Sequence, residues 1–455
     1  MIETSLWFET ALVGGTWRDA VRITHHDGRI SNIDSDTPAQ PDDECAGIGV
    51  PGLANVHSHA FQRGMAGLAE TAGPADDDFW TWREVMYRFL DRLDPDDVEA
   101  IAALAFAEML EGGFTRVGEF HYLHNAPDGR AYADPAELAT RVAAAADQTG
   151  IALTLLPVLY AHGGFGGQAP SPGQRRFLST TDGFAGLVDG ARRAVAGLAD
   201  SRVGVAPHSL RAVTPNELTS VVALGAGGPI HIHVAEQVRE VSDCEAWSGQ
   251  RPVAWLLDYA DVDAHWCLIH ATHVDEAEMA GIIRSGAVAG LCPITEANLG
   301  DGVFPAARFL GGGGRFGLGT DSNVLIDVGQ ELRALEYGQR LTRRARNVLA
   351  GDDRPSVGGT LFEAALAGGA QALGVKEAAI SVGAPLDAVS LDPNHLSLIG
   401  RRGDALLDGW IFGARAGAID GVWRAGRKVV SEGRHVDKTV IALRYSRVLR
   451  RLLAA

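Results

Sequence analysis

Eight short apolar runs, separated by helical segments, constrain this chain more than any other feature. They begin near Leu53, Phe114, Ile151, Arg202, Pro229, Trp266, Ala287 and Arg315. Each run is nearly continuous in apolar residues, which is typical of strands covered on both faces of a parallel sheet. Eight such strands alternating with helices predict a (β/α)8 barrel, a TIM-like fold of the α/β class.

One of the intervening helices carries clear start and stop signals. Asp94 can cap it, Pro95 suits its first position, and Gly112 with Gly113 ends it. Another glycine run, residues 311–314, is not followed by the Lys-Ser or Lys-Thr of a phosphate-binding loop. We interpret that run as the turn into the eighth strand.

The two ends of the chain differ from this middle part. Short β-type runs broken by Gly and Asp fill the first 50 residues and return near Asp387. This texture predicts one small β-sandwich domain made from both ends. The predicted division is 1–50 with 380–438 for that domain, 51–379 for the barrel, and 439–455 for a C-terminal helix.

Residue types that bind metals fall at the ends of the predicted strands. The first strand ends in His57-Ser58-His59, and residues i and i+2 of a strand point to the same side, so both imidazoles can reach one ion. The fifth strand carries His233 and the eighth ends in Asp321. Catalytic groups of barrels lie at these strand ends. Three nitrogens and one carboxylate suit Zn²⁺, or another borderline divalent ion such as Fe²⁺.

Each of these signals is weak alone. The chain has 15 histidines, so an H-x-H pair arises by chance or for packing, and an Asp at a strand end often caps a helix. The prediction of a metal site depends on their conjunction. His231 stands in register with His233, and the residues by themselves allow either to be the ligand.

Glu236, three residues after His233, is a candidate proton shuttle. On a continuous strand the two side chains would face opposite sides, but a strand that ends at Val234 before a turn would bring both to the barrel mouth. A surface glutamate at a helix start is the plainer alternative. His270, at the end of the sixth strand, is a second candidate for acid–base chemistry.

Together these residues resemble the amidohydrolase superfamily. Its signature corresponds to Pro51-Gly52-Leu53 through His57-Ser58-His59, then His233, His270 and Asp321, and the small domain built from both ends also matches. The resemblance covers nearly the whole chain. It implies that His233 rather than His231 is the ligand. It also implies a single ion, because the fourth-strand segment 203–208 has no lysine to carboxylate.

Four further stretches resemble one subfamily, the deiminases that act on N-formimino-L-glutamate in histidine degradation. They are residues 59–63 (HAFQR), 79–84 (FWTWRE), 118–124 (GEFHYLH) and 208–211 (HSLR). That substrate has two carboxylates and a cationic formimino group. The resemblance implies that Arg83, Arg211 and His208 supply local positive charge, and that Gln62 and Tyr122 add neutral hydrogen bonds. Without it, both arginines would be interpreted as solvated charges.

The activity implied by the resemblance is hydrolytic deimination, which yields N-formyl-L-glutamate and ammonia. Asp321 would accept a proton from the attacking water, Glu236 would pass protons to the departing nitrogen, and His270 would orient the attacking oxygen. Two alternatives stay open. One is a deaminase of the same superfamily acting on a purine or pyrimidine, and the other is a barrel scaffold without catalysis.

The composition limits the classes of binding partner that we expect. A formal net charge of −17 disfavours nucleic acid and anionic membranes, so a small anionic substrate requires a local basic pocket. Four cysteines without C-x-x-C spacing indicate no disulfide framework. We find no signal peptide and no segment able to span a bilayer, and expect a cytoplasmic protein. The superfamily resemblance implies a homodimer.

Overall fold

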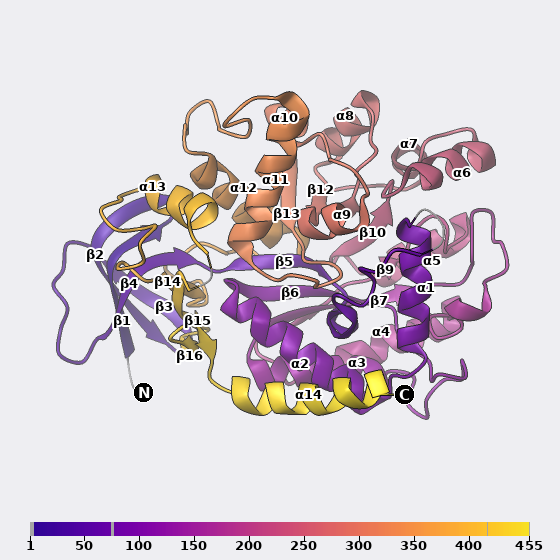
Figure 1. The fold of residues 1–455 in the computed structure, drawn as a ribbon, viewed down its shortest axis with the longest axis horizontal. Helices are drawn as coiled ribbons and strands as arrows, with labels where there is room; N and C mark the ends of the chain where they lie inside the picture. Colours follow the sequence, from indigo (N-terminus) through magenta and orange to yellow (C-terminus); the bar gives the residue numbers. More distant parts are fainter. Residues whose placement is uncertain (1–3, 74–76, 416, 455) are drawn as a thin grey trace.

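The computed structural model describes residues 4–73, 77–415 and 417–454, and it contains two sheets that lie side by side (Figure 1). The larger sheet is parallel. Its strands are β5 (Leu53–Ser58), β6 (Phe114–His121), β7 (Ala152–Leu159), β8 (Arg202–Val203), β9 (Ala206–Pro207), β10 (Ile230–Val234), β11 (Trp266–His270), β12 (Val288–Leu291) and β13 (Arg315–Leu318).

The larger sheet closes on itself. β13 pairs with β5, which joins the last strand to the first. On the other side, parallel bridges from Val205 to Ile230 and from Ser209 to His233 join the fourth strand segment to β10. Each predicted apolar run corresponds to one strand, and the fourth is divided into β8 and β9. The prediction of a TIM-like barrel is therefore confirmed.

Helices surround this barrel, as the ribbon shows (Figure 1). They are α1 (Phe79–Leu90), α2 (Pro95–Glu111), α3 (Glu137–Thr149), α4 (Thr181–Val195), α5 (Pro215–Leu224), α6 (Val238–Ser248), α7 (Pro252–Tyr259), α8 (Glu276–Ser285), α9 (Pro293–Leu299), α10 (Ala306–Gly311), α11 (Val328–Arg343) and α12 (Val357–Ala372), with short helices η1 (Ala60–Met65) and η2 (Pro172–Gln174). The glycines 311–314 lead from α10 into β13, as predicted.

The helix predicted from its capping signals is α2. Asp94 accepts a hydrogen bond from the backbone of Asp97, whose side chain accepts in return from the backbone of Asp94, so the two residues form a capping box. Pro95 occupies the first turn and Gly112 the C-cap. One face of the helix is buried against the barrel, where Ile101, Ala105 and Met109 have no exposed surface. The prediction is confirmed at both ends.

Helix α12 closes the bottom of the barrel. Gly368 lies so close to β13 that a Cβ atom there would overlap the carbonyl oxygen of Phe316. At the C-terminal end of the helix, the carbonyl oxygen of Ala372 accepts a hydrogen bond from the ring of His231 inside the barrel. The interior is therefore filled from below, and its open end is the mouth formed by the C-terminal strand ends.

The second sheet combines both ends of the chain. Its strands, in spatial order, are β17 (Arg434–His435), β16 (Arg427–Ser431), β15 (Ile419–Arg424), β14 (Ala388–Leu391), β4 (Glu44–Pro51), β1 (Thr4–Val13), β2 (Thr16–His26) and β3 (Arg29–Asp34). The antiparallel pairing of β14 with β4 joins the two ends of the chain. The short helix α13 (Asp404–Asp408) and the π-helical turn η3 (Gly409–Gly413) precede β15.

Partly buried ion pairs connect this sheet to the barrel. Arg424 of β15 contacts Asp387 at 2.9 Å and Asp200 at 3.2 Å. Asp200 also pairs with Arg116 of β6. One carboxylate thus joins an arginine from each sheet. The exact domain boundaries stay a prediction.

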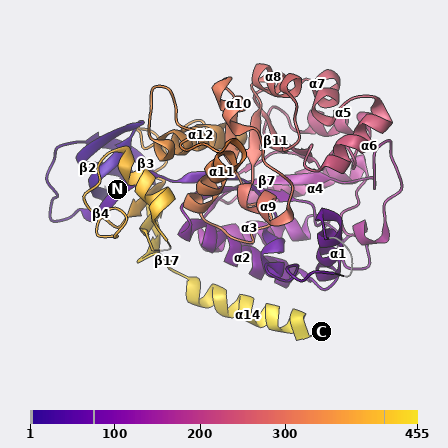
Figure 2. The same ribbon diagram turned by 45° about the horizontal axis from the view of Figure 1, so that its top comes forward.

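The C-terminal helix α14 (Lys438–Ala454) lies on the outside of α2 (Figures 1 and 2). Lys438 contacts Glu111 at 2.7 Å and Arg444 contacts Glu99 at 2.5 Å, so basic residues of α14 face acidic residues of α2. The helix begins one residue before the predicted start, and residue 455 of the prediction lies outside the described residues. Within the described part of the chain, we find no helix long and apolar enough to cross a membrane.

Candidate active site

Four predicted ligands meet at the mouth of the barrel. His57 and His59 come from the end of β5, His233 from β10 and Asp321 from the turn after β13, and one ligand atom from each lies within 4.8 Å of the others. Asp321 Oδ1 is 3.2 Å from the Nε2 atoms of both His57 and His59. The Nε2 atoms of His57 and His233 are 3.0 Å apart.

The donors of this cluster suit a divalent cation. Nδ1 of His59 is 3.0 Å from the carbonyl oxygen of Phe120, and Nδ1 of His233 is 3.0 Å from that of His208. An imidazole that donates from Nδ1 presents the lone pair of Nε2. Two or more such lone pairs directed at one another and at a carboxylate repel unless a cation lies between them. The residues therefore fit the expected metal.

The ionisation states agree with metal binding. Burial lowers the pKa of His57 to about 3. Burial also holds the pKa of His233 well below its usual value, and neighbouring His57 lowers it further. Burial opposes ionisation of Asp321, but its contacts with His57 and His59 outweigh this and hold its pKa well below the usual range. Neutral imidazoles and an ionised carboxylate are the forms that coordinate metals.

The backbone around Asp321 is held in an unusual conformation. Asp321 has φ +44° and Asn323 has φ +56°, in the left-handed region that favours glycine. The Asn323 side-chain amide donates to the carbonyl oxygens of Asp321 at 3.0 Å and His59 at 3.1 Å, and to Ser58 Oγ at 3.1 Å. One buried amide thus ties the eighth strand end to the first. Strain held in this way is typical of functional sites.

His231 lies outside the metal cluster. It shares the inward side of β10 with His233, but its Nε2 is 2.8 Å from the carbonyl oxygen of Ala372. In His233, by contrast, the Nε2 atom faces the cluster. Of the two histidines that the sequence left open, the structure brings His233 to the other ligands.

Glu236 reaches the barrel mouth because the chain turns after the end of β10. β10 ends at Val234, and Ala235 has φ +53°, so the chain bends directly before Glu236. Glu236 Oε1 then lies 3.8 Å from His270 Nε2, and the other ring nitrogen of His270 is 3.3 Å from Glu296 Oε1. His270 itself has φ +66°. Glu236 and His270 form a pair beside the metal cluster.

Burial and neighbouring charges shift the pKa values of the two side chains, so that Glu236 titrates near neutral pH and His270 stays cationic. Burial raises the pKa of Glu236 to about 7. Burial would lower the pKa of His270, but the carboxylates of Glu236 and Glu296 outweigh it and raise that pKa to about 10. Glu236 can therefore exchange a proton near neutral pH. His270 can donate a charged hydrogen bond.

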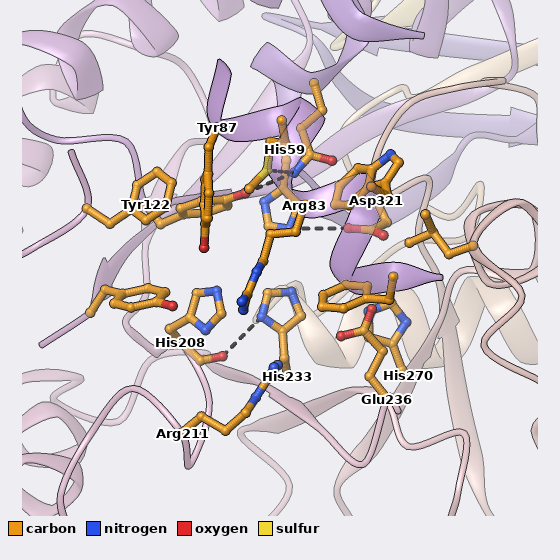
Figure 3. A pocket seen from close by; sticks show the side chains of 17 residues that line it. His59, Arg83, Tyr87, Tyr122, His208, Arg211, His233, Glu236, His270 and Asp321 are labelled. Atoms are coloured by element: carbon orange, nitrogen blue, oxygen red, sulfur yellow. Dashed lines mark hydrogen bonds and ion pairs between the residues drawn. The ribbon is translucent and has the colours of Figure 1, made fainter. Parts of the chain in front are cut away.

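A small pocket of about 60 Å³ opens above the cluster (Figure 3). It is lined by ten of the predicted site residues, namely His59, Gln62, Arg83, Tyr122, His208, Arg211, His233, Glu236, His270 and Asp321. His57 lies beneath it and is fully buried. Gln62 Nε2 donates to the Tyr122 hydroxyl at 2.9 Å, which fixes these two neutral side chains against each other.

Two arginines enter the pocket from different elements (Figure 3). Arg83 comes from α1 and Arg211 from the loop after β9. The Nε atoms of both are buried and have no hydrogen-bond partner among the described residues. Their guanidinium carbons lie 4.5 and 5.6 Å from the ring centre of Trp80, so one indole ring contacts both cations. Buried cationic donors without hydrogen-bond partners suit an anionic ligand.

His208 departs from its predicted role as a source of charge. Burial holds its pKa well below the usual value, and the neighbouring cation Arg211 lowers it further. The imidazole is therefore neutral, and its Nδ1 lies 3.2 Å from Ser209 Oγ. His208 lines the pocket as predicted, but the positive charge comes from the two arginines.

Several residues of the site were not predicted from the sequence. Tyr160 lines the pocket directly after β7, so the rule that strand ends carry function could have found it. Tyr87 lines it one helical turn beyond Arg83, which the spacing i, i+4 predicts. Glu296 and Asn323 act through contacts between distant segments, and no local signal marks them.

Comparison with known proteins places this geometry in a family. Residues 48–429 match the amidohydrolase family, and the chain belongs to that family of hydrolases. The chain is 51% identical over 452 residues to formimidoylglutamate deiminase of Pseudomonas aeruginosa, which covers 99% of this chain and 100% of the relative.

Two further similarities extend this result. The crystal structure of an amidohydrolase from Brucella melitensis superposes with a TM-score of 0.96 at 52% identity, over 99% of this chain and 100% of that one. At 31% identity over 360 residues, the chain is similar to 5-methylthioadenosine/S-adenosylhomocysteine deaminase of Natronomonas pharaonis, over 76% of this chain and 74% of the relative.

Proposed function

We propose that this protein is a formimidoylglutamate deiminase, which hydrolyses N-formimino-L-glutamate to N-formyl-L-glutamate and ammonia in histidine degradation. The observation that carries the proposal is a pocket with two unlike sides. Four metal ligands and Glu236 lie on one side, and two arginines with free donors lie on the other. The similarity along the whole chain to a deiminase of that name supports the same substrate.

The arginines favour a dicarboxylate over a nucleobase. A carboxylate offers two oxygens in the geometry of a guanidinium fork, and a charged hydrogen bond contributes more than a neutral one. The protein as a whole carries a net charge of −17, so an anion needs such a local cationic pocket. A neutral purine would leave the free guanidinium donors of Arg83 and Arg211 without an anion inside the pocket, at a cost in binding free energy.

We propose His57, His59, His233 and Asp321 as the ligands of one divalent ion, and we propose Zn²⁺ as that ion because three imidazoles and a carboxylate suit it. When bound, the ion supplies a Lewis acid that lowers the pKa of the attacking water. Asp321, held ionised, takes a proton from that water. The water oxygen bonds to the formimino carbon, and the bond from this carbon to the terminal nitrogen breaks.

Glu236 and His270 divide the remaining proton chemistry. Glu236, whose pKa burial raises to about 7, delivers a proton to the terminal nitrogen so that it leaves as ammonia, and it takes the remaining proton of the water oxygen as the formyl carbonyl forms. His270, held cationic by Glu236 and Glu296, donates a hydrogen bond to the oxygen as negative charge develops there. Tyr122 and Gln62 would contact the substrate as neutral donors beside Arg83.

Two wider properties belong to the same proposal. The four cysteines are all free, three of them buried, which suits a reducing cytoplasm. We propose that the protein works there as a homodimer, as members of the superfamily commonly do.

An ammonia-release assay tests the function. Purified protein with a measured metal content is offered N-formimino-L-glutamate beside guanine, cytosine and S-adenosylhomocysteine. We expect one metal ion per chain and ammonia only from the first compound. Release from a nucleobase or nucleoside instead would establish the purine or pyrimidine alternative. A chain that binds no metal and releases no ammonia would be the non-catalytic scaffold.

A further inference from the structure

A buried carboxylate behind the pocket contacts both sides of it. Glu240 lies in the first turn of α6 and has no exposed surface. Its Oε2 accepts the backbone N–H of Glu236 at 3.1 Å and lies 4.0 Å from Nη2 of Arg211. Its Oε1 has no hydrogen-bond partner among the described residues. One oxygen therefore faces the proton shuttle and an arginine of the substrate side.

A purely structural role would not require this arrangement. The buried Glu278, in the first turn of α8, accepts backbone N–H groups from Val253, Ala254 and Asp275, and pairs with Arg251 at 2.8 Å. Glu240 accepts one backbone N–H group and leaves an oxygen free. Burying a carboxylate with so few partners costs free energy.

Arg211 needs an anchor on its inner side. It lines the small pocket and also an outer groove of about 850 Å³, whose walls include the carboxylates of Glu84 and Asp243. Its Nε has no hydrogen-bond partner among the described residues, and its side chain is 12% exposed. Space and acidic partners outside therefore allow the guanidinium to turn away from the pocket, and Glu240 is the carboxylate on the inner side that opposes this.

Glu236 needs an anchor for a different reason. It follows Ala235, whose φ of +53° is costly for a residue other than glycine. The hydrogen bond from the Glu236 N–H to Glu240 closes this turn against the start of α6. The direction of the Glu236 carboxylate therefore depends on Glu240 through the backbone.

We infer that Glu240 is a positioning residue that links substrate recognition to proton transfer: it holds Arg211 towards the pocket through its charge and Glu236 towards the reacting nitrogen through its oxygen. The inference rests on the proposed function, because it assigns Arg211 to a substrate carboxylate and Glu236 to proton delivery. It predicts that the two tasks of Glu240 can be separated by substitution.

Two variants separate them. Glu240→Gln keeps an oxygen for the Glu236 N–H and removes the charge. We therefore expect Arg211 to lose its orientation and KM for N-formimino-L-glutamate to rise about tenfold, while kcat stays within about twofold of wild type. Glu240→Ala removes both, so kcat should also fall, by about tenfold or more. N-propylformamidine, which has the amidine and no carboxylate, should be insensitive to Glu240→Gln and slowed by Glu240→Ala.

Hydrogen exchange of the Glu236 amide gives a readout that does not require activity. Mass spectrometry of peptides covering residues 230–240 should show protection retained in Glu240→Gln and lost in Glu240→Ala. Glu278→Gln serves as the matched control, since Glu278 is also buried at a helix start beside an arginine, and it lines neither cavity. It should leave KM, kcat and the exchange of this segment unchanged.

The outcomes distinguish this inference from the proposed function. Wild-type protein that releases no ammonia from N-formimino-L-glutamate contradicts the proposed function, and the exchange measurement then still tests the anchoring of Glu236. Active wild type with unchanged KM in Glu240→Gln overturns the inference. A lower KM in that variant also overturns it, because Glu240 would then compete with the substrate for Arg211. Unchanged exchange in Glu240→Ala removes the link to Glu236.

Discussion

The two sides of the pocket differ in how completely their polar atoms are held. On the metal side, His59 and His233 each direct Nδ1 to a backbone carbonyl at 3.0 Å, and Asn323 ties the backbone of Asp321. On the arginine side, the Nε atoms of Arg83 and Arg211 are buried without hydrogen-bond partners in the described chain. Two of the three histidine ligands on the metal side are thus held by ring hydrogen bonds, with Nδ1 of His57 left without a partner among the described residues, whereas both arginines of the other side have free donors.

The origin of the residues explains this difference. The metal side comes from strand ends, which the closed barrel holds rigidly at one height. The arginine side comes from helix α1 and a loop, and its charges contact the Trp80 ring. Under the proposed function, the barrel scaffold therefore holds the groups that carry the reaction, and side chains with unused donors bind the substrate. Substitutions on the two sides should therefore change different kinetic constants.

The largest effect should come from Asp321→Asn on the metal side. The substitution keeps the shape of the side chain but removes both the anionic ligand and the proton acceptor. We expect kcat to fall by about 10⁴-fold, the upper range for loss of a general base, together with weaker metal binding. Ammonia release and metal analysis of the same sample measure both. A variant that keeps its metal and more than a tenth of wild-type kcat would contradict the role given to Asp321.

Glu236→Gln should have the next largest effect. The amide cannot deliver a proton to the terminal nitrogen, so kcat should fall by about 10²- to 10³-fold. The metal content should stay at the wild-type value, because Glu236 lies beside the cluster and not in it. Near-normal turnover with metal bound would show that another group moves the proton.

The sequence predicted the metal side better than the arginine side, for a physical reason. Strand periodicity places His57 and His59 on one side, and the common height of barrel strands brings His233 and Asp321 to them. The sequence also predicted that Glu236 reaches the barrel mouth only if the chain turns after the fifth strand. The positive φ of Ala235 provides that turn. These inferences need only local pattern and the symmetry of the barrel.

The rest of the site depends on contacts that no local pattern contains. Glu296 orients His270 across 26 residues of sequence, and Asn323 reaches Ser58 across 265. The neutral state of His208 follows from its burial, which the sequence does not show. For the same reason the charge on Arg83 could not be distinguished from a solvated helix face without the family resemblance.

Arg83→Met tests the arginine side and should change KM more than kcat. Methionine keeps much of the apolar stem of the side chain and removes the guanidinium, which lies over the Trp80 ring. Loss of a charged hydrogen bond costs about 1.5–3 kcal/mol, which corresponds to a KM about 10- to 150-fold higher for N-formimino-L-glutamate. Arg88→Met, on the exposed side of the same helix, is the control and should match wild type. A fall in kcat at unchanged KM would place Arg83 in the chemistry and erase the contrast between the two sides.

The smallest effect should come from His231→Gln, which tests where the metal side ends. His231 shares the strand and the side of His233, but its Nε2 contacts the carbonyl oxygen of Ala372 beneath the cluster. Glutamine can donate to that oxygen, so we expect full metal content and kcat/KM within about threefold, with a loss of about 1–3 kcal/mol in unfolding free energy from imperfect hydrogen bonding of buried groups. His233→Gln should lose the metal. If both variants lost it, the ligand set would extend a layer deeper into the barrel, and register on the strand alone would decide metal binding. The expected contrast would instead show that the surroundings of Nε2 select the ligand, since this atom faces the cluster in His233 and the carbonyl oxygen of Ala372 in His231.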